Sequence, residues 1–144
     1  MIYDCYPTKL LKNIRNIASH PDIFPFMLPV SVENLPPLHL NAILKPELTV
    51  YMLRINYKQA GLGFFTKKEN EAIVDVCFLP NYRGKDAKVV AMLAIEDYIS
   101  KNKVSALIGK IRKSNPRSLI FSKWCMFHME HEDEQFYYVR RCHG

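Results

Sequence analysis

The spacing of apolar residues along the chain changes from one segment to the next and predicts a series of different elements. Residues Thr8 to Ala18 carry apolar side chains three and four positions apart, with Lys, Asn and Arg opposite them, which predicts a helix with Thr8 as its N-cap. From Pro21 to Pro46 the chain holds six of its nine prolines, which excludes regular helix over most of the segment. We expect an irregular loop there that either lines a binding site or covers the core.

Three runs rich in β-branched and aromatic residues follow, separated by short polar turns. They are Leu48 to Asn56, Gln59 to Lys67 and Glu71 to Leu79. Runs of this length and composition, joined by such short turns, predict an antiparallel three-stranded meander.

The second half of the chain alternates between helical and strand patterns. Helical spacing extends from Asp86 to Lys101, and Val104 to Ile111 returns to a short strand, so a parallel crossover is predicted. A further helix is predicted from Ser114 to about Met126, and Phe127 to Arg141 predicts a hairpin with an acidic tip. We therefore expect a single domain over residues 1–144, of mixed α/β class, with a mostly antiparallel sheet and one parallel strand pair.

Composition narrows the class of protein but not its function. Apolar residues make up 49% and charged residues 24%, the balance of a soluble globular chain, and no apolar run approaches the roughly 18 residues of a membrane span. The first residues lack the features of a signal peptide, and the four scattered cysteines are expected to stay reduced in a cytoplasm. The net charge of +6 implies an anionic ligand, for which nucleic acid, a phosphorylated cofactor and an acidic partner all qualify.

The segment from Val74 to Asp97 has the features of an anion site. A strand leads through the basic turn Arg83-Gly84-Lys85 into a helix. A helix N-terminus presents unpaired backbone N–H groups and about half a positive charge, so it holds a phosphate without a dedicated side chain. Gly84 would let a ligand approach the backbone closely, and Arg83 and Lys85 add charge.

This segment resembles the phosphate loop of the GNAT superfamily of acyl-CoA-dependent N-acyltransferases, in particular the small GNAT-like proteins of tailed phages. The family pattern is Arg or Gln, two variable residues, Gly, one variable residue, then Gly or Ala, often preceded by a strand and Pro-x-Tyr. The matching residues are Pro80, Tyr82, Arg83, Gly84 and Lys85. The order of the predicted elements agrees with the family over nearly the whole chain, including a first strand that the resemblance implies.

Two positions of the loop depart from the family pattern. Asp86 stands where the first signature Gly is expected, and Lys88 stands where the second small residue is expected, although Ala87 fits if the loop is shifted by one. The Asp86 carboxylate would either oppose a bound phosphate or point away as a helix N-cap.

A second match lies downstream, where the family often has an Asn, a small residue three positions later, a general-acid Tyr seven later, and Gly-Phe at eleven and twelve. The residues at these positions are Asn115, Ser118, Ser122, Met126 and Phe127. Asn115 and Phe127 fit the pattern. Ser122 replaces the Tyr that returns a proton to the departing thiolate, and a serine hydroxyl is a much poorer acid.

The resemblance implies acetyl-CoA as cofactor and an amine as acceptor, with direct attack of the amine on the thioester. The implied cofactor-binding residues are Cys77, Phe78, Leu79, Arg83, Gly84, Lys85, Asp86, Ala87, Lys88 and Asn115. In this scheme the strand backbone stabilises the oxyanion, either Glu71 or Asp75 acts as base, and Ser122 takes the position of the acid.

Two functions stay open at this point. One is an acetyl-CoA-dependent N-acyltransferase, favoured by the intact loop lead-in. The other is a catalytically inactive protein of the same fold that acts as a phage structural or assembly component, in a virion, or binds a host protein. The changes at Asp86, Ser122 and Met126 favour this alternative. The resemblance assigns acceptor choice to residues 21–46 and the closing hairpin, and neither the acceptor nor the oligomeric state follows from the sequence.

Two other constellations are weaker. Cys125, His128 and His131 are zinc-ligand types, but their spacing is not that of a known finger and the two His would face opposite sides of a strand, so no metal is expected. Basic residues are scattered from Lys101 to Arg141 with aromatic residues among them, a composition that nucleic-acid-binding proteins share. Solvated surface and a phosphorylated cofactor account for these charges, so neither nucleic acid nor a membrane is the expected partner.

Overall fold

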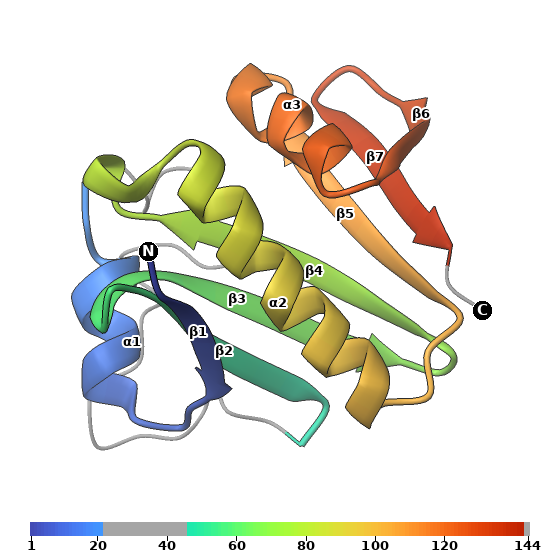
Figure 1. Cartoon of the computed structure of the whole chain (residues 1–144). Helices are drawn as coiled ribbons and strands as arrows, with labels where there is room; N and C mark the ends of the chain where they lie inside the picture. Colours follow the sequence, from blue (N-terminus) through green and yellow to red (C-terminus); the bar gives the residue numbers. More distant parts are fainter. Residues whose placement is uncertain (22–45, 143–144) are drawn as a thin grey trace.

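A computed structural model describes residues 1–21 and 46–142 and shows helices on both faces of one mixed sheet (Figure 1). The elements are β1 Tyr3–Pro7, α1 Leu11–Ala18, β2 Leu48–Ile55, β3 Lys58–Lys68, β4 Glu71–Phe78, the short 3-10 turn η3 Pro80–Tyr82, α2 Lys85–Lys101, β5 Ala106–Arg112, α3 Pro116–Trp124, β6 His128–Glu132 and β7 Phe136–Cys142. The strand order is β1-β2-β3-β4-β5-β7-β6. Neighbouring strands are antiparallel except β4 and β5, which are parallel.

Strand alternation divides the core between the two faces of the sheet. On one face, α2 packs over Phe65, whose ring stacks on Tyr98 at 4.4 Å between centroids and meets Tyr51 edge-on at 5.4 Å. On the other face, Ile14 and Ile17 of α1 pack against neighbouring strand residues in a second cluster. Successive residues of β2 alternate between these two clusters, because side chains along a strand point to opposite faces.

The predicted architecture is confirmed in class and topology. The three-stranded meander is present as β2, β3 and β4, and α2 connects β4 to the parallel strand β5. The predicted third helix and closing hairpin correspond to α3, β6 and β7. None of the helices in the described ranges is long and apolar enough to cross a membrane. The Pro-rich loop prediction falls mostly on residues 22–45, which lie outside the described residues.

The N-terminal segment differs from the prediction made from the apolar pattern. Tyr3–Pro7 forms the edge strand β1, which only the family resemblance implied, and α1 begins at Leu11. Thr8 is not the N-cap of α1: its backbone N–H donates to the Val50 carbonyl, and its hydroxyl oxygen accepts the Leu10 N–H at 3.2 Å. Pairing with β2 therefore holds Thr8 at the end of the strand, which local helical spacing does not reveal.

Candidate acyl-CoA site

The parallel strands β4 and β5 separate partway along their length. Their pairing covers Glu71–Ile73 of β4 and 106–108 of β5, and ends there. The Leu79 N–H donates to the Ala60 carbonyl of β3 at 2.9 Å, and the backbone edges of a strand alternate from residue to residue. The backbone amides of Val76 and Phe78 therefore point toward the opening between the two strands.

A cavity of about 420 Å³ lies at this opening. Its wall is formed by the C-terminal half of β4, by the turn that leads into α2, and by one side of α3. Arg83 and Arg117 contribute positive charge to the wall, and Asp75 is its one carboxylate among the described residues. The cavity thus combines free strand edge, a helix N-terminus and a positive balance of charge, which suits an elongated anionic ligand.

The turn before α2 has the backbone that close approach of a phosphate requires. Gly84 is the N-cap of α2 with φ 121° and ψ −147°, a conformation that residues with a Cβ rarely adopt. A Cβ placed on Gly84 would have no protein atom within 4 Å, so the space beside it is open. Arg83 donates from Nε to the Phe78 carbonyl at 3.1 Å, which holds its side chain over the end of β4, where it lines the cavity.

Asp86 points away from this turn. It lies in the first turn of α2, where Gly84 and not Asp86 is the N-cap, and its Oδ1 accepts a 2.5 Å hydrogen bond from the Tyr3 hydroxyl of β1. This hydrogen bond raises the pKa of Tyr3. Asp86 does not line the cavity. The Asp86 carboxylate is therefore held by a tyrosine of the edge strand β1. It does not cap α2, which was one of the two roles considered from the sequence.

We expect Tyr3→Phe to weaken CoA binding about fivefold, because the released Asp86 carboxylate would regain access to a phosphate bound at the turn. The measurement is calorimetric titration with CoA. The double variant Tyr3→Phe/Asp86→Asn is the control, and it should recover wild-type affinity because no carboxylate remains. Unchanged affinity in the single variant would show that Tyr3 has no such role.

The predicted cofactor-binding residues fall into two groups. Those that line the larger cavity are Cys77, Phe78, Arg83, Gly84, Ala87 and Asn115, and those that do not are Leu79, Lys85, Asp86 and Lys88. The backbone N–H of Leu79 donates to the Ala60 carbonyl and so cannot donate to a ligand. Lys85 and Lys88 are exposed on α2, outside the cavity. Ala87 is 1% exposed and lines the larger cavity, whereas Lys88 does not.

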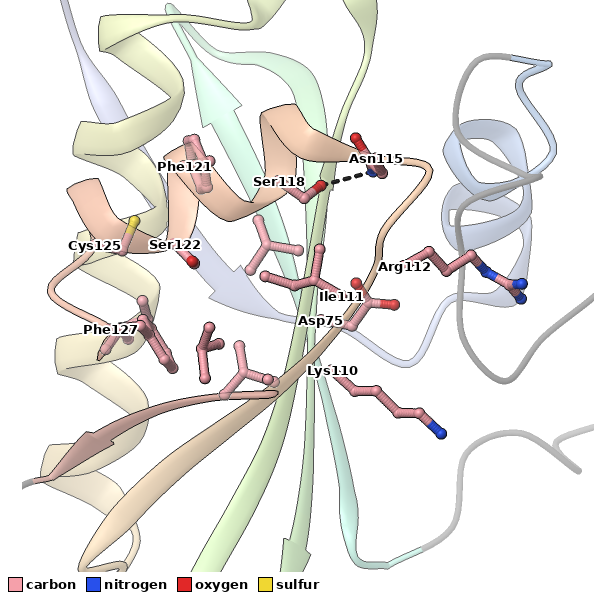
Figure 2. Close-up of a pocket in the computed structure, with 15 residues that line it drawn as sticks. Asp75, Lys110, Ile111, Arg112, Asn115, Ser118, Phe121, Ser122, Cys125 and Phe127 are labelled. Atoms are coloured by element: carbon pink, nitrogen blue, oxygen red, sulfur yellow. Dashed lines mark hydrogen bonds between the residues drawn. The ribbon is translucent and has the colours of Figure 1, made fainter. Parts of the chain in front are cut away.

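A smaller cavity of about 90 Å³ lies beside the larger one and is shown in Figure 2. Of the three predicted catalytic residues, Asp75 lines both cavities, Ser122 lines one of them and Glu71 lines neither. Glu71 begins β4, about 23 Å from Phe78 at the usual strand rise, and it forms an ion pair with Arg140. Glu71 lines neither cavity and therefore does not belong to the candidate site.

Ser122 and Asn115 are both close to the opening, and both side chains have local partners. Ser122 lines the smaller cavity, but its hydroxyl donates to the Leu119 carbonyl at 2.7 Å. Asn115 precedes α3 and lines both cavities, and its Nδ2 donates to the Ser118 hydroxyl at 2.7 Å (Figure 2). Neither arrangement presents a strong acid to the cavity.

The thiols beside the cavities are poor nucleophiles. Burial raises the pKa of Cys77, which lines the larger cavity, well above its usual value. Burial also raises the pKa of Cys125, at the wall of the smaller cavity, to about 11. Because the thiolate is the reactive form, these environments do not favour covalent catalysis by cysteine.

One wall of the larger cavity was missed by the sequence analysis. Arg117, Ile120 and Trp124 of α3 line it together with Phe121. Ile120 and Trp124 are 52% and 46% exposed, although both are large apolar residues. Their apolar character on a short helix after Asn115 was the available signal, but it does not distinguish a cavity wall from a core contact.

The fold is that of the GNAT N-acetyltransferases, as comparison with solved structures shows. Campylobacter jejuni N-acetyltransferase PseH in complex with acetyl coenzyme A superposes with a TM-score of 0.61 at 21% identity, over 71% of this chain and 72% of that one. A GNAT-family acetyltransferase from Streptococcus pneumoniae gives 0.71 at 11% identity, over 99% and 100%. Vibrio cholerae spermidine N-acetyltransferase, in complex with CoA and spermine, gives 0.76 at 14% identity, over 97% and 95%. No family model and no curated protein matches the sequence.

Proposed function

We propose that this protein is an acyl-CoA-dependent N-acyltransferase that moves an acetyl group from acetyl-CoA to an amine. The observation that carries the proposal is the position of the larger cavity, which joins the opened edge of β4 to the Arg83–Gly84 turn at the N-terminus of α2. The similar structures with acetyl-CoA or CoA bound support the choice of cofactor. The phage association suggested by the sequence stays a prediction.

The residues present fit a CoA molecule. The N-terminus of α2 at Gly84 and the side chain of Arg83 would hold the pyrophosphate, because they offer backbone donors and a fixed positive charge. Arg117 would add charge from α3, and the edge of β4 would hold the pantetheine through the amides of Val76 and Phe78.

Acetyl-CoA would supply an activated thioester, and the chain would supply alignment and charge. The amides that face the opening would donate hydrogen bonds to the thioester carbonyl oxygen as negative charge develops on it. Asp75, at the junction of the two cavities, would accept a proton from the attacking amine. No tyrosine lines either cavity in the described part of the chain, so we assign proton return to solvent and not to a side chain.

Calorimetric titration with CoA and acetyl-CoA, using the wild type and Arg83→Glu, tests the proposal. We expect saturable binding by the wild type and at least about a 30-fold loss in the variant, because a charged hydrogen bond is removed and a like charge introduced. Lys103→Glu is the matched control: it makes the same charge change beyond the C-terminal end of α2, about 25 Å from Gly84.

These titrations distinguish a wrongly assigned CoA site from a CoA-binding protein without catalysis. No binding of CoA by the wild type at millimolar concentration, or equal loss in Arg83→Glu and Lys103→Glu, would contradict the assigned site. CoA binding without release of thiol in the presence of any amine would favour the alternative of a binding protein that retains the fold and lacks catalysis.

A further inference from the structure

Lys110 and Arg112 carry positive charge to the strand opening from the β5 side. Ile73 and Ile108 are the last partners of the parallel pair, so Asp75 and Lys110, two residues further along each strand, point to the same face of the sheet. Arg112 follows on that face, and all three residues line the smaller cavity. Figure 2 shows the three side chains directed away from Phe121, Ser122 and Cys125.

Three other basic residues in and near the closing hairpin form ion pairs with carboxylates. Arg140 pairs with Glu71 and Glu130, Arg141 with Glu96 at 2.6 Å, and Lys113 with Glu132 at 2.7 Å. In contrast, neither Lys110 nor Arg112 forms an ion pair with any residue that the structure describes. Among the described residues of β5, β6 and β7, Lys110 and Arg112 are thus the lysine and arginine without an ion pair, and both line the smaller cavity.

The immediate surroundings of these two cations are aromatic. Lys110 Nζ lies 4.1 Å from the centroid of the Phe136 ring, and Arg112 Cζ lies 5.9 Å from it. The Nε atom of Arg112 is buried and has no hydrogen-bond partner among the described residues, which is a costly state for a charged donor. Among the described residues, Arg112 therefore has at least one donor without a partner, and the side chain of Lys110 contacts aromatic rings.

One carboxylate at the hairpin tip also faces this region. Hydrogen bonds from the Tyr138 hydroxyl and from the backbone N–H groups of Gln135 and Phe136 lower the pKa of Asp133, and the charge of Lys110 adds to them. Asp133 is thus held within the hairpin. Asp75 is the carboxylate that shares the cavity wall with the two cations.

We infer that the face formed by Asp75, Lys110 and Arg112 binds an acceptor that carries an anionic group, phosphate or carboxylate, besides its reacting amine. The inference rests on the proposed function. Arg112 and Lys110 would hold the anionic oxygens, and Asp75 would face the amine. A polycation such as the spermine bound by the V. cholerae enzyme would meet two unpaired positive charges here and is disfavoured.

The test is binding to the full chain saturated with CoA, followed by the ¹⁵N–¹H signal of Arg112 Nε and by calorimetry. The probes are glucosamine 6-phosphate, glucosamine, glutamate and spermidine. We expect glucosamine 6-phosphate or glutamate to shift the Nε signal saturably and to bind at least about tenfold more tightly than glucosamine or spermidine. The phosphate and carboxylate arms separate the two sources of negative charge.

Substitutions of the two cations test whether the anionic probe binds at this face. Arg112→Gln and Lys110→Gln should each weaken the anionic probe about tenfold, whereas Lys103→Gln, an exposed lysine outside both cavities, should not. Equal binding by Arg112→Gln, no binding of either anionic probe, or tighter binding of spermidine would overturn the inference. Because CoA binding is measured first, failure of the cofactor site is recognised separately from failure of the acceptor face.

Discussion

Gly84→Ala is expected to weaken CoA binding about 100-fold or more, because it moves the backbone donors that the turn presents to a phosphate. With φ at 121° and ψ at −147°, Gly84 has a conformation that an alanine adopts only at a cost of about 1–3 kcal/mol. The turn would relax to avoid that strain. The added Cβ would also enter the open space beside Gly84, where no protein atom lies within 4 Å.

Calorimetry with CoA measures this effect, and thermal unfolding of the unliganded variant shows whether the domain remains folded. Lys85→Ala is the control, since it changes the next side chain, outside the cavity, without altering the backbone. It should lower affinity by less than about fivefold, as expected for an exposed charge. Near wild-type affinity of Gly84→Ala would mean that the turn does not bind the phosphates.

Phe65→Ala is expected to lower the free energy of unfolding by about 3–5 kcal/mol. The ring is fully buried between Tyr51 and Tyr98 under α2, so its removal leaves a cavity and breaks two aromatic contacts. Urea denaturation followed by circular dichroism measures the loss. A change this large removes a substantial fraction of the stability of an ordinary domain.

Phe65→Leu provides the matched control for the core. It keeps most of the buried apolar volume and should cost less than half as much as the alanine variant, because a smaller cavity remains. A loss below about 1 kcal/mol for Phe65→Ala would contradict the assignment of Phe65 to the centre of the main core.

Most of the fold could be predicted from local patterns in the sequence. The meander, α2 and α3 are predicted within a few residues of their observed ends, because apolar periods of two and of 3.6 residues and short polar turns act over short distances. The edge strand β1 was missed by periodicity. Its five residues are held by pairing with β2, a contact between segments about 50 positions apart, which no local pattern contains.

The candidate site could be predicted from the sequence only in part. The Arg83–Gly84 turn lies between β4 and α2 as predicted, because glycine and basic residues between a strand and a helix favour such a turn, and its binding of phosphate stays a prediction. Glu71 and Asp75 have the same chemistry on the same strand, and only the pairing of β5 with the first part of β4 places one away from the cavities and the other beside them. The role of Asp86 likewise depended on Tyr3, which lies 83 residues away in the chain.

The sequence by itself determined the class of the fold, the position of the Arg83–Gly84 turn and the positive charge of the chain. The tertiary structure decided which of the basic side chains form ion pairs and which line a cavity. Lys110, Arg112, Arg140 and Arg141 look alike in the sequence, but the two arginines of β7 meet carboxylates of other elements, whereas the two residues of β5 line the opening. Charge type is a property of a residue, whereas neutralisation depends on which distant residue folding brings within a few ångströms.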